Sequence, residues 1–361
     1  MGKDRVVVAM SGGVDSSVAA ALLKSKGYEV IGITMCFNLP DSVRKKPLCC
    51  GVQARDDARC VSHKLGIRHY VLNMQEALEK KVIADFCKEY LRGRTPNPCV
   101  RCNQYLKFDI LLKKALALHA KFLATGHYAR VIKTRQGYQL KKAKDKVKDQ
   151  SYFLYSLSQK QLKHILFPLG NYTKTEVRKL AKEFDLPVAQ KKASQEICFL
   201  PDSDYRGFLK TRLSAFGGKP GIKPGEIIDK QTEVLGQHQG IAFYTIGQRE
   251  GLGIAKGYPL YVIKINPKDN TITVGEKEDV YRTEFSIKNP HFILGPRKKK
   301  IALKVRIRYN HPEASARVIF SQNKIKVKFK KPQFAITPGQ SAVFYDKDTV
   351  LGGGIIDQVG Q

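Results

Sequence analysis

The stretch RVVVAMSGGVDSS, residues 5–17, decides the fold class of the first part of the chain. Its β-branched run over 5–10 predicts a buried strand, and the apolar spacing that follows predicts a helix over 15–26. Glycines in the turn between them let backbone N–H groups and the helix N-terminus converge on an anion, with serine hydroxyls as further donors. Asp15 in such a phosphate site calls for a cation, and we expect Mg²⁺.

The same alternation of strand and helix continues up to about residue 125. Strands are expected over 29–36, 68–73 and 121–125, and helices over 55–65, 74–91 and 103–119. Strands that alternate with helices imply a parallel sheet wrapped in helices, with right-handed connections.

The texture of the sequence changes after about residue 204. Turn clusters at 217–221 and 223–225 precede short strand-like runs at 242–246, 260–265, 271–275, 304–309 and 324–330. The last run, KIKVKFK, alternates at period two, so one face is expected to be apolar and the other lysine. We therefore predict an α/β domain over 1–203 and two small β-rich domains over 204–278 and 279–361.

The charge of the chain is strongly unbalanced. There are 64 Lys+Arg against 32 Asp+Glu, a net charge of +32, and residues 281–361 alone hold 16 against 5. This excess favours nucleic acid as the partner, ahead of an acidic membrane surface, although a generally lysine-rich proteome would also produce it. The basic runs at 141–148 and 297–300 are expected to contact phosphates.

Other compositional features indicate a cytoplasmic protein. No apolar run approaches the roughly 20 residues of a membrane span, and the N-terminus enters a strand without the apolar region of a signal peptide. Eight cysteines in such a chain favour thiols, a metal or catalysis over a disulfide framework.

Two of the cysteines form a C-x-x-C pair, Cys99 and Cys102, in a proline-stiffened turn that enters a helix. A helix N-terminus and the neighbouring Arg101 are expected to lower the thiol pKa there. Cys198 lies far along the chain. Two separated thiols and a phosphate-binding loop suggest sulfur chemistry, in which one thiol carries a persulfide and the other forms a disulfide with it.

The remaining cysteines are expected to be structural. Cys36, Cys60 and Cys87 fall within apolar or helical patterns and are predicted to be small core residues. Cys49 and Cys50 lack enough partner ligands nearby for a metal site. A four-cysteine zinc site lacks its second C-x-x-C.

The loop after the first strand matches the SGGxDS loop of ATP pyrophosphatases, and the chain as a whole resembles the tRNA-specific 2-thiouridylases. The landmarks that carry this resemblance, all read directly from the sequence, are residues 9–17, 95–98, 102–103, 107–108, 124–128, 148–154, 195–199, 244–249, 251–253, 308–309 and 337–340.

The resemblance implies an enzyme, a sulfurtransferase that uses ATP and Mg²⁺ to adenylate the 2-oxo group of uridine 34 of tRNA. Sulfur from a protein persulfide then replaces the oxygen and gives 2-thiouridine. The implied fold is α/β, an ATP-pyrophosphatase domain like the adenine nucleotide α-hydrolases, followed by two small β-rich domains, the last a β-barrel. The implied partners are tRNA and a sulfur-donor protein, either a cysteine desulfurase or a sulfur-relay protein.

The resemblance also assigns residues, position by position. Cys102 would be the nucleophile, and Cys198 would carry the persulfide and form a disulfide with Cys102 during turnover. The target base must leave its stack to expose C2. ATP would contact Ala9, Met10, Ser11, Gly12, Gly13, Val14, Asp15, Ser16, Met35 and Gly126. The target base would face Asn97, Pro98 and Cys99, and tRNA would contact His127, Lys148, Asp149, Gln150, Arg308, Tyr309 and Gln340.

One position departs from the family pattern, because Cys99 stands where an Asp usually completes the Asn-Pro-Asp turn. Either Cys99 replaces that carboxylate as a weaker proton acceptor, or Cys99, Cys102 and Cys198 hold a [4Fe-4S] cluster that delivers sulfide. Two other functions remain open. One is another adenylating synthetase with the same loop, and the other is an RNA-binding protein that keeps ATP as a structural ligand.

Overall fold

A five-stranded parallel sheet forms the centre of the first domain. The computed structural model describes residues 3–37, 52–192, 197–200, 204–214, 220–295, 300–320 and 325–360. The strands are parallel, as expected from the alternating sequence, and their order is β3-β2-β1-β4-β7, with the topological switch beside β1. The strands are β1 (Arg5–Ala9), β2 (Glu29–Cys36), β3 (Arg68–Asn73), β4 (Phe122–Thr125) and β7 (Ile165–Leu166).

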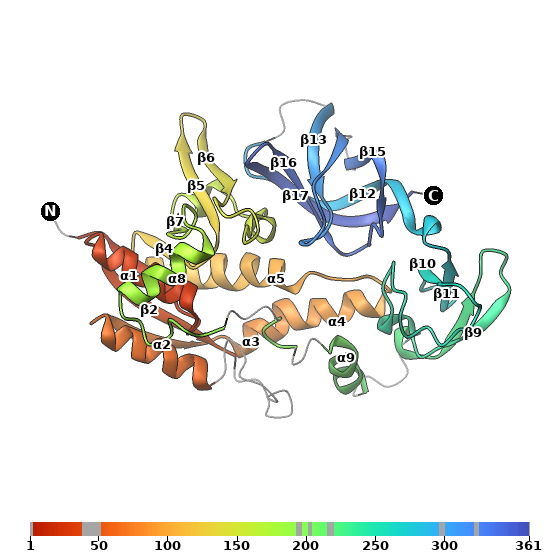
Figure 1. The fold of residues 1–361 in the computed structure, drawn as a ribbon, viewed down its shortest axis with the longest axis horizontal. Coiled ribbons are helices and arrows are strands. Elements are labelled where there is room, and N and C mark those ends of the chain that lie inside the picture. The colour runs from red at the N-terminus through yellow and green to blue at the C-terminus, as the bar shows by residue number, and fades with distance from the viewer. Residues whose placement is uncertain are drawn as a thin grey trace.

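Helices cover both faces of this sheet (Figure 1). On one face lie α1 (Val14–Ser25), α2 (Val52–Lys64) and α8 (Lys174–Glu183), which pack on Val6 and Val8, while Val7 points into the opposite core. On the other face lie two long helices with π-helical middles. The first comprises α3 (Gln75–Leu78), a π stretch (Glu79–Ile83) and α4 (Ala84–Leu91), and the second α5 (Pro98–Arg101), a π stretch (Cys102–Leu111) and α6 (Leu112–Ala117).

The second long helix begins five residues earlier than expected from its apolar spacing. Asn97 caps it by accepting a hydrogen bond from the Val100 N–H at 3.2 Å, and Pro98 occupies the first turn. Proline at this position loses no hydrogen bond, since the first N–H groups of a helix have no partner inside it. Cys99 and Cys102 therefore lie on the first turns of this helix.

The middle of the chain forms a small sheet in the order β10-β11-β8-β9, preceded by α9 (Tyr205–Ser214). The strand expected over 242–246 is wrong, because a 3-10 turn (Ile241–Phe243) stands there. Gly240 has a φ of 129° and accepts from the Phe243 N–H, so this apolar run is buried in a turn. The strands are β8 (Gly225–Ile228), β9 (Val234–His238), β10 (Tyr261–Asn266) and β11 (Thr271–Gly275).

The last six strands close into a barrel in the order β12-β15-β14-β13-β16-β17, with β12 also paired to β17. The alternation in β15 is confirmed, since Ile325, Val327 and Phe329 are buried and the lysines between them are exposed. The strand expected over 304–309 ends early, at Arg306. The strands are β12 (Tyr281–Phe292), β13 (Lys300–Arg306), β14 (Ala314–Phe320), β15 (Ile325–Phe334), β16 (Ser341–Asp346) and β17 (Thr349–Val359).

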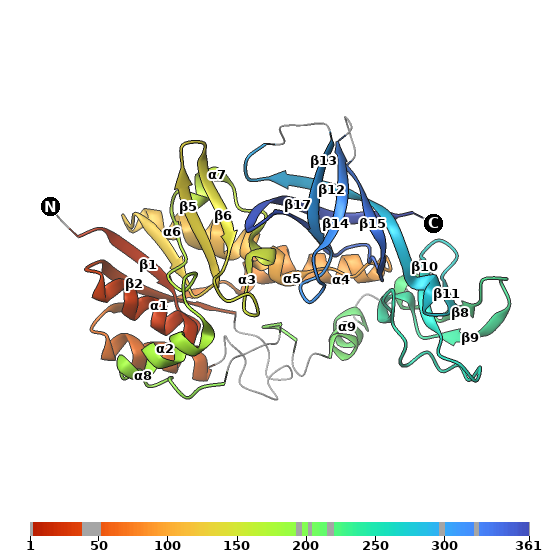
Figure 2. The ribbon, with the colours of Figure 1, turned by 45° about the horizontal axis from the view of Figure 1, so that its top comes forward.

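A hairpin of the first domain extends the sheet of this barrel (Figure 2). Its strands are β5 (Ala129–Thr134) and β6 (Gly137–Lys142), and β6 pairs with β17 through Lys141 opposite Thr349 and Leu140 opposite Val350. The basic run at 141–148 is thus partly strand, and Lys142 forms an ion pair with Glu313 at 2.7 Å. The other basic run lies outside the described residues apart from Lys300.

No helix among the described residues is both long enough and apolar enough to cross a membrane.

Candidate active site

The loop between β1 and α1 is shaped by its own serines. The Ser11 N–H donates to Ser16 Oγ at 3.1 Å, and the Ser17 hydroxyl donates to the Gly13 carbonyl at 2.9 Å. Gly13 is the N-cap residue of α1, so the loop ends at a helix N-terminus. The arrangement presents backbone N–H groups and a positive helix end to an anion.

Two glycines bring neighbouring chains into contact with this loop. Gly12 has a φ of 66°, and a Cβ there would lie 2.1 Å from the Ala54 carbonyl oxygen of α2. A Cβ on Gly126, at the end of β4, would lie 2.8 Å from the Ser16 nitrogen. A larger residue at either position would push the loop out of place.

The counter-charge of Asp15 comes from the protein itself. Lys174 Nζ, at the first turn of α8, lies 2.6 and 2.7 Å from the two carboxylate oxygens, and the Tyr128 hydroxyl donates to Oδ1 at 2.8 Å. Lys174 thus supplies a counter-charge that the sequence alone assigns only to Mg²⁺. The carboxylate in turn raises the pKa of Tyr128, together with burial.

Two further lysines reach the site from distant positions. Lys191 Nζ donates to the Gly12 carbonyl at 3.0 Å and forms an ion pair with Asp57 of α2. Lys107 lies on the π-helical stretch and lines the cavity described next. Sequence reasoning missed Lys174 and Lys191, since nothing in their local sequence distinguishes them from the chain's many other lysines. It placed Lys107 in a family landmark, 107–108, but gave it no role in the site.

A cavity of about 320 Å³ joins the nucleotide loop to the three candidate thiols. It is bounded by the ends of β1, β2 and β4 and by the first turns of the second long helix. Its lining residues are Ala9, Met10, Ser11, Asp15, Ser16, Ile33, Met35, Phe37, Val82, Pro98, Cys99, Cys102, Asn103, Lys107, Thr125, Gly126, His127, Gln150, Phe153, Ile197, Cys198 and Phe199. Segments some hundred residues apart thus meet in one space.

The Cys102 thiol is buried, with 9% of the residue exposed. Burial raises its pKa, and the positive charge of Lys107 only partly opposes this effect. The expected lowering of the pKa by Arg101 is wrong, because the Arg101 guanidinium turns away to Asp85 at 3.0 Å and Gln104 at 3.2 Å. Cys102 is thus protonated at neutral pH in this state.

Cys198 also lines the cavity and belongs to the described segment 197–200. Phe199, next to it, is almost fully buried and packs edge-on against Phe86 of α4 with the ring centroids 5.4 Å apart. This contact anchors the described segment 197–200 to the first domain. Cys102 and Cys198 are not joined by a disulfide in this structure.

The three candidate thiols are the nearest approach to a metal-binding donor set in the cavity. Cys99, Cys102 and Cys198 line the same cavity, yet among the described ranges no three Cys, His, Asp or Glu side chains form a group that could hold a metal ion. In this structure the three thiols are therefore not gathered as ligands of one metal ion. A Mg²⁺ that arrives with ATP needs fewer protein ligands, because it keeps waters and binds phosphates, and Asp15 alone could hold it.

His127 lies inside the cavity, where tRNA contact was expected of it. Only 9% of it is exposed, its Nδ1 lies 2.7 Å from Thr125 Oγ1, and Phe108 and Phe167 pack on the ring with centroids 5.9 Å away. Burial and the charge of Lys107 lower its pKa well below the usual value. The imidazole is therefore neutral.

The other residues expected to contact tRNA are dispersed. Gln150 lines the cavity and accepts from the Tyr128 N–H at 3.0 Å. Asp149 is buried and accepts from the Ser151 hydroxyl at 2.8 Å, and burial raises its pKa. Lys148 is half-buried, next to it. A tRNA contact by Asp149 would need this buried carboxylate to be uncovered.

The barrel residues among them lie at domain boundaries. The Tyr309 ring packs on Phe153 with centroids 4.5 Å apart, at the cavity wall. Arg308 donates to the Ala335 carbonyl at 2.6 Å and lines an open groove of about 650 Å³ together with Arg206. Gln340 is buried between the barrel and the turn before Cys99.

The three cysteines expected in the core differ in burial. Cys36 is buried, and Cys87 is half-buried, which raises its pKa to about 11. Cys60 is exposed on α2, so that expectation is wrong for it. Helical spacing alone did not show which side of α2 faces the sheet. Cys49 and Cys50 lie outside the described residues.

Comparisons with known proteins agree with these three parts. The family model of the tRNA methyl transferase HUP domain matches residues 4–202. That of the tRNA methyl transferase PRC-barrel domain matches residues 216–276, and that of the aminomethyltransferase beta-barrel domain residues 282–356. The expected fold class, a nucleotide-binding α/β domain followed by two β-rich domains ending in a barrel, is confirmed.

Similar relatives span nearly the whole chain. A tRNA-specific 2-thiouridylase MnmA of Halothermothrix orenii is 50% identical and covers 98% of this chain and 99% of its own. The MnmA 2 of Caldanaerobacter subterraneus subsp. tengcongensis is 51% identical, with 98% of each chain covered. The MnmA of Carboxydothermus hydrogenoformans is 49% identical, with 99% of each covered.

Proposed function

The chain belongs to the tRNA-specific 2-thiouridylase family, and on that premise we propose that it catalyses the ATP-dependent 2-thiolation of the wobble uridine, position 34, of tRNA. It is thus a sulfurtransferase. The observation that supports this most directly is the single cavity in which Ser11 and Asp15 of the nucleotide loop face Cys99, Cys102 and Cys198. An adenylating synthetase that uses amine donors would have no need of these thiols.

The first half-reaction takes place at the nucleotide loop. ATP phosphates bind the N–H groups at the start of α1, and the 2-oxo oxygen of the flipped uridine attacks the α-phosphorus while pyrophosphate leaves. Asp15 would hold the Mg²⁺ that accompanies ATP, which neutralises the departing pyrophosphate. Lys174 then exchanges its carboxylate partner for a phosphate, so the site keeps its charge balance.

The second half-reaction transfers sulfur. A persulfide on Cys198, loaded by a cysteine desulfurase or a sulfur-relay protein, attacks C2 of the adenylated uridine, and AMP leaves with the former 2-oxo oxygen. The Cys102 thiolate then attacks Cys198 Sγ, which forms a Cys102–Cys198 disulfide and leaves the terminal sulfur on the base. A thiol reductant supplies two electrons to reopen the disulfide.

Cys99 would act in this scheme as the proton acceptor for Cys102, in place of the carboxylate usual in the family. A group of this kind is needed because burial raises the pKa of Cys102. Both residues lie on the first turns of one helix and line the same cavity.

Cysteine substitutions test the proposal. Cys102→Ala and Cys198→Ala should each abolish 2-thiouridine formation, measured by nucleoside mass spectrometry, while tRNA affinity stays within about twofold because the thiols carry no charge toward phosphate. Cys60→Ala, an exposed thiol on α2, is the matched control and should retain full activity. Full activity of either active-site variant would remove that cysteine from the mechanism.

Iron analysis distinguishes this route from sulfide delivery by a [4Fe-4S] cluster. Protein purified without oxygen is assayed for iron, acid-labile sulfide and thiolation in one sample. Activity in iron-free protein supports the persulfide route. A stoichiometric cluster whose removal abolishes activity would contradict it and would make Cys99, Cys102 and Cys198 ligands.

A further inference from the structure

Three sequence landmarks, one from each domain, meet at Thr95. The Thr95 N–H donates to the Pro338 carbonyl of the barrel at 2.9 Å, and its carbonyl accepts from Gln340 Nε2 at 3.0 Å. Its hydroxyl donates to Thr245 Oγ1 of the middle domain at 3.1 Å. Thr95 belongs to the junction segment, 94–97, which links α4 to the helix that carries Cys99 and Cys102.

The barrel side of this contact is the turn 338–340. Gln340 is 9% exposed, and its amide donates to the Pro96 carbonyl at 3.0 Å as well as to that of Thr95. Gly339 has a φ of 96°, and a Cβ there would lie 2.7 Å from the Thr95 carbonyl oxygen. Only glycine lets the turn 338–340 and the junction segment approach this closely.

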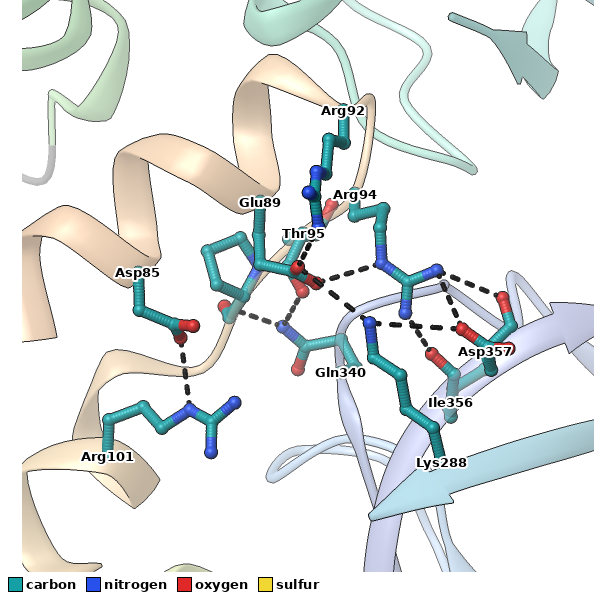
Figure 3. Close-up of polar contacts among 11 residues, drawn as sticks. Asp85, Glu89, Arg92, Arg94, Thr95, Arg101, Lys288, Gln340, Ile356 and Asp357 are labelled. Carbon is teal, nitrogen blue, oxygen red and sulfur yellow. Dashed lines mark hydrogen bonds and ion pairs between the residues drawn. The ribbon is translucent and has the colours of Figure 1, made fainter. Parts of the chain in front are cut away.

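Arg94 forms a second connection between the same two parts (Figure 3). Its Nε lies 2.8 Å from Glu89 Oε2 on α4, while its other nitrogens donate to the carbonyls of Ile356 at 2.8 Å and Asp357 at 3.1 Å on β17. Glu89 is 8% exposed, and Lys288 Nζ of β12 lies 3.8 Å from its carboxylate. The buried carboxylate is therefore compensated by cations from both sides of the boundary.

The junction segment leads directly into the helix that carries the two thiols. Asn97, its last residue, caps the helix that begins at Pro98, and Cys102 follows one turn later. A shift of the segment would therefore move the whole first turn of the helix. The distance from Gln340 to the site is bridged by two peptide units and one helix turn.

We propose that Gln340 and Arg94 are positioning residues through which the barrel holds the start of α5, and with it Cys102, in place for the reaction. The resemblance to the 2-thiouridylases implies that Gln340 contacts tRNA, whereas its amide here spans two carbonyls of the junction segment. The expected loss of thiolation activity rests on the proposed function, whereas the expected change in the accessibility of Cys102 does not.

The test is Gln340→Met in the full chain, which keeps the length of the side chain and removes the amide. Loss of two hydrogen bonds to the segment should lower kcat for thiolation by about tenfold, with the tRNA KM and Kd within about twofold. Cys102 should become more accessible, so its alkylation by iodoacetamide without tRNA should be about fivefold faster or more, measured by peptide mass spectrometry.

Gln333→Met is the matched control. The side-chain amide of this half-buried glutamine of the same barrel donates to carbonyls of its own strand, at Lys331 and Pro332, and the variant should leave both rates unchanged. ATP-binding stoichiometry reports the folded fraction of each variant. If Gln340→Met does not fold, Arg94→Lys is the second variant. It keeps a positive charge beside Glu89 but loses the hydrogen bonds to the carbonyls of β17, and the same changes in kcat and in Cys102 alkylation are expected.

Two results would overturn the inference. A raised tRNA Kd with unchanged alkylation of Cys102 would make Gln340 a tRNA contact only. Unchanged kcat and unchanged alkylation would show that the barrel does not position the thiol. If the wild-type chain does not thiolate tRNA at all, the proposed function fails, while the alkylation comparison still decides the positioning role.

Discussion

Asp15 places a negative charge beside an anion-binding loop, and Lys174 compensates that charge. Both carboxylate oxygens lie within 2.7 Å of Lys174 Nζ. In Mg²⁺-free buffer, Lys174→Met would leave an uncompensated negative charge beside the ATP phosphates, so ATP affinity measured there by calorimetry should fall by about tenfold.

Lys179→Met is the control for this prediction, because that lysine lies on the same helix and pairs only with exposed Glu183 at 3.7 Å. In the same Mg²⁺-free buffer, Asp15→Asn combined with Lys174→Met should recover part of the ATP affinity, since the unpaired charge is gone and no metal has to be held. An unchanged affinity in Lys174→Met alone would contradict the balancing role.

The protonation of Cys102 gives a second prediction at this scale. Burial disfavours the thiolate, so the alkylation rate of Cys102 should rise with pH to a midpoint above that of an ordinary thiol, about 8.5. Lys107→Met removes the nearby positive charge and should move the midpoint higher still. Lys113→Met, an exposed lysine paired with Asp109, should leave it in place. A midpoint below the ordinary value would mean that burial does not control this thiol.

The sequence revealed the candidate thiols and the nucleotide loop because both are short motifs, read within a few residues. It did not reveal Lys174, which reaches Asp15 across 159 positions of sequence. It also misjudged Arg101, since adjacency in sequence to Cys102 does not fix the direction of a long side chain that finds Asp85 instead. Electrostatics at this scale depends on the tertiary fold.

At the scale of elements, the loop depends on how closely α2 approaches it. Gly12→Ala would place a Cβ 2.1 Å from the Ala54 carbonyl oxygen, so the loop or α2 must move. We expect ATP affinity to fall by about tenfold or more and the melting temperature to drop.

Gly27→Ala separates this clash from the strain of a left-handed backbone. Gly27 has a similar φ of 85° but open space around it. That variant should lose only about 1 kcal/mol of unfolding free energy, measured by urea denaturation, and keep its ATP affinity. Equal losses of ATP affinity in both variants would rule out the contact with α2 as the cause.

Elements with a clear period were predictable, and those set by tertiary contacts were not. The strand over 68–73 coincides with β3, and the lysine face of β15 follows its alternation. The apolar run at 242–246 was misassigned because burial in a turn and burial in a strand demand the same residues. The hairpin of β5 and β6 was missed, since its strands carry polar and basic residues.

At the scale of the molecule, net charge governs the encounter with tRNA. With a surplus of 32 positive charges, we expect the logarithm of tRNA affinity to fall linearly with that of salt concentration, by about 100-fold or more from 50 to 200 mM. Filter binding measures this, and ATP affinity in the same buffers corrects for general salt effects. A flat response would contradict binding dominated by phosphates.

The number and class of the domains followed from changes in sequence texture, but their assembly did not. No local pattern indicates that Gln340 of the barrel meets Thr95, or that Lys288 approaches Glu89. Such contacts join surfaces that each look polar by themselves. If the proposed positioning role of Gln340 and Arg94 holds, these boundaries complete the candidate site as much as its own motifs do.

The pairing of β6 with β17 has a consequence for biosynthesis. Lys141 emerges from the ribosome some two hundred residues before its partner Thr349. At translation rates of about 5–20 residues per second, that edge of the hairpin waits roughly 10–40 seconds for its partner strand. During this interval an open strand edge is available to other nascent chains. A ribosome stall between these strands would therefore leave the nucleotide-binding domain largely made yet prone to aggregate.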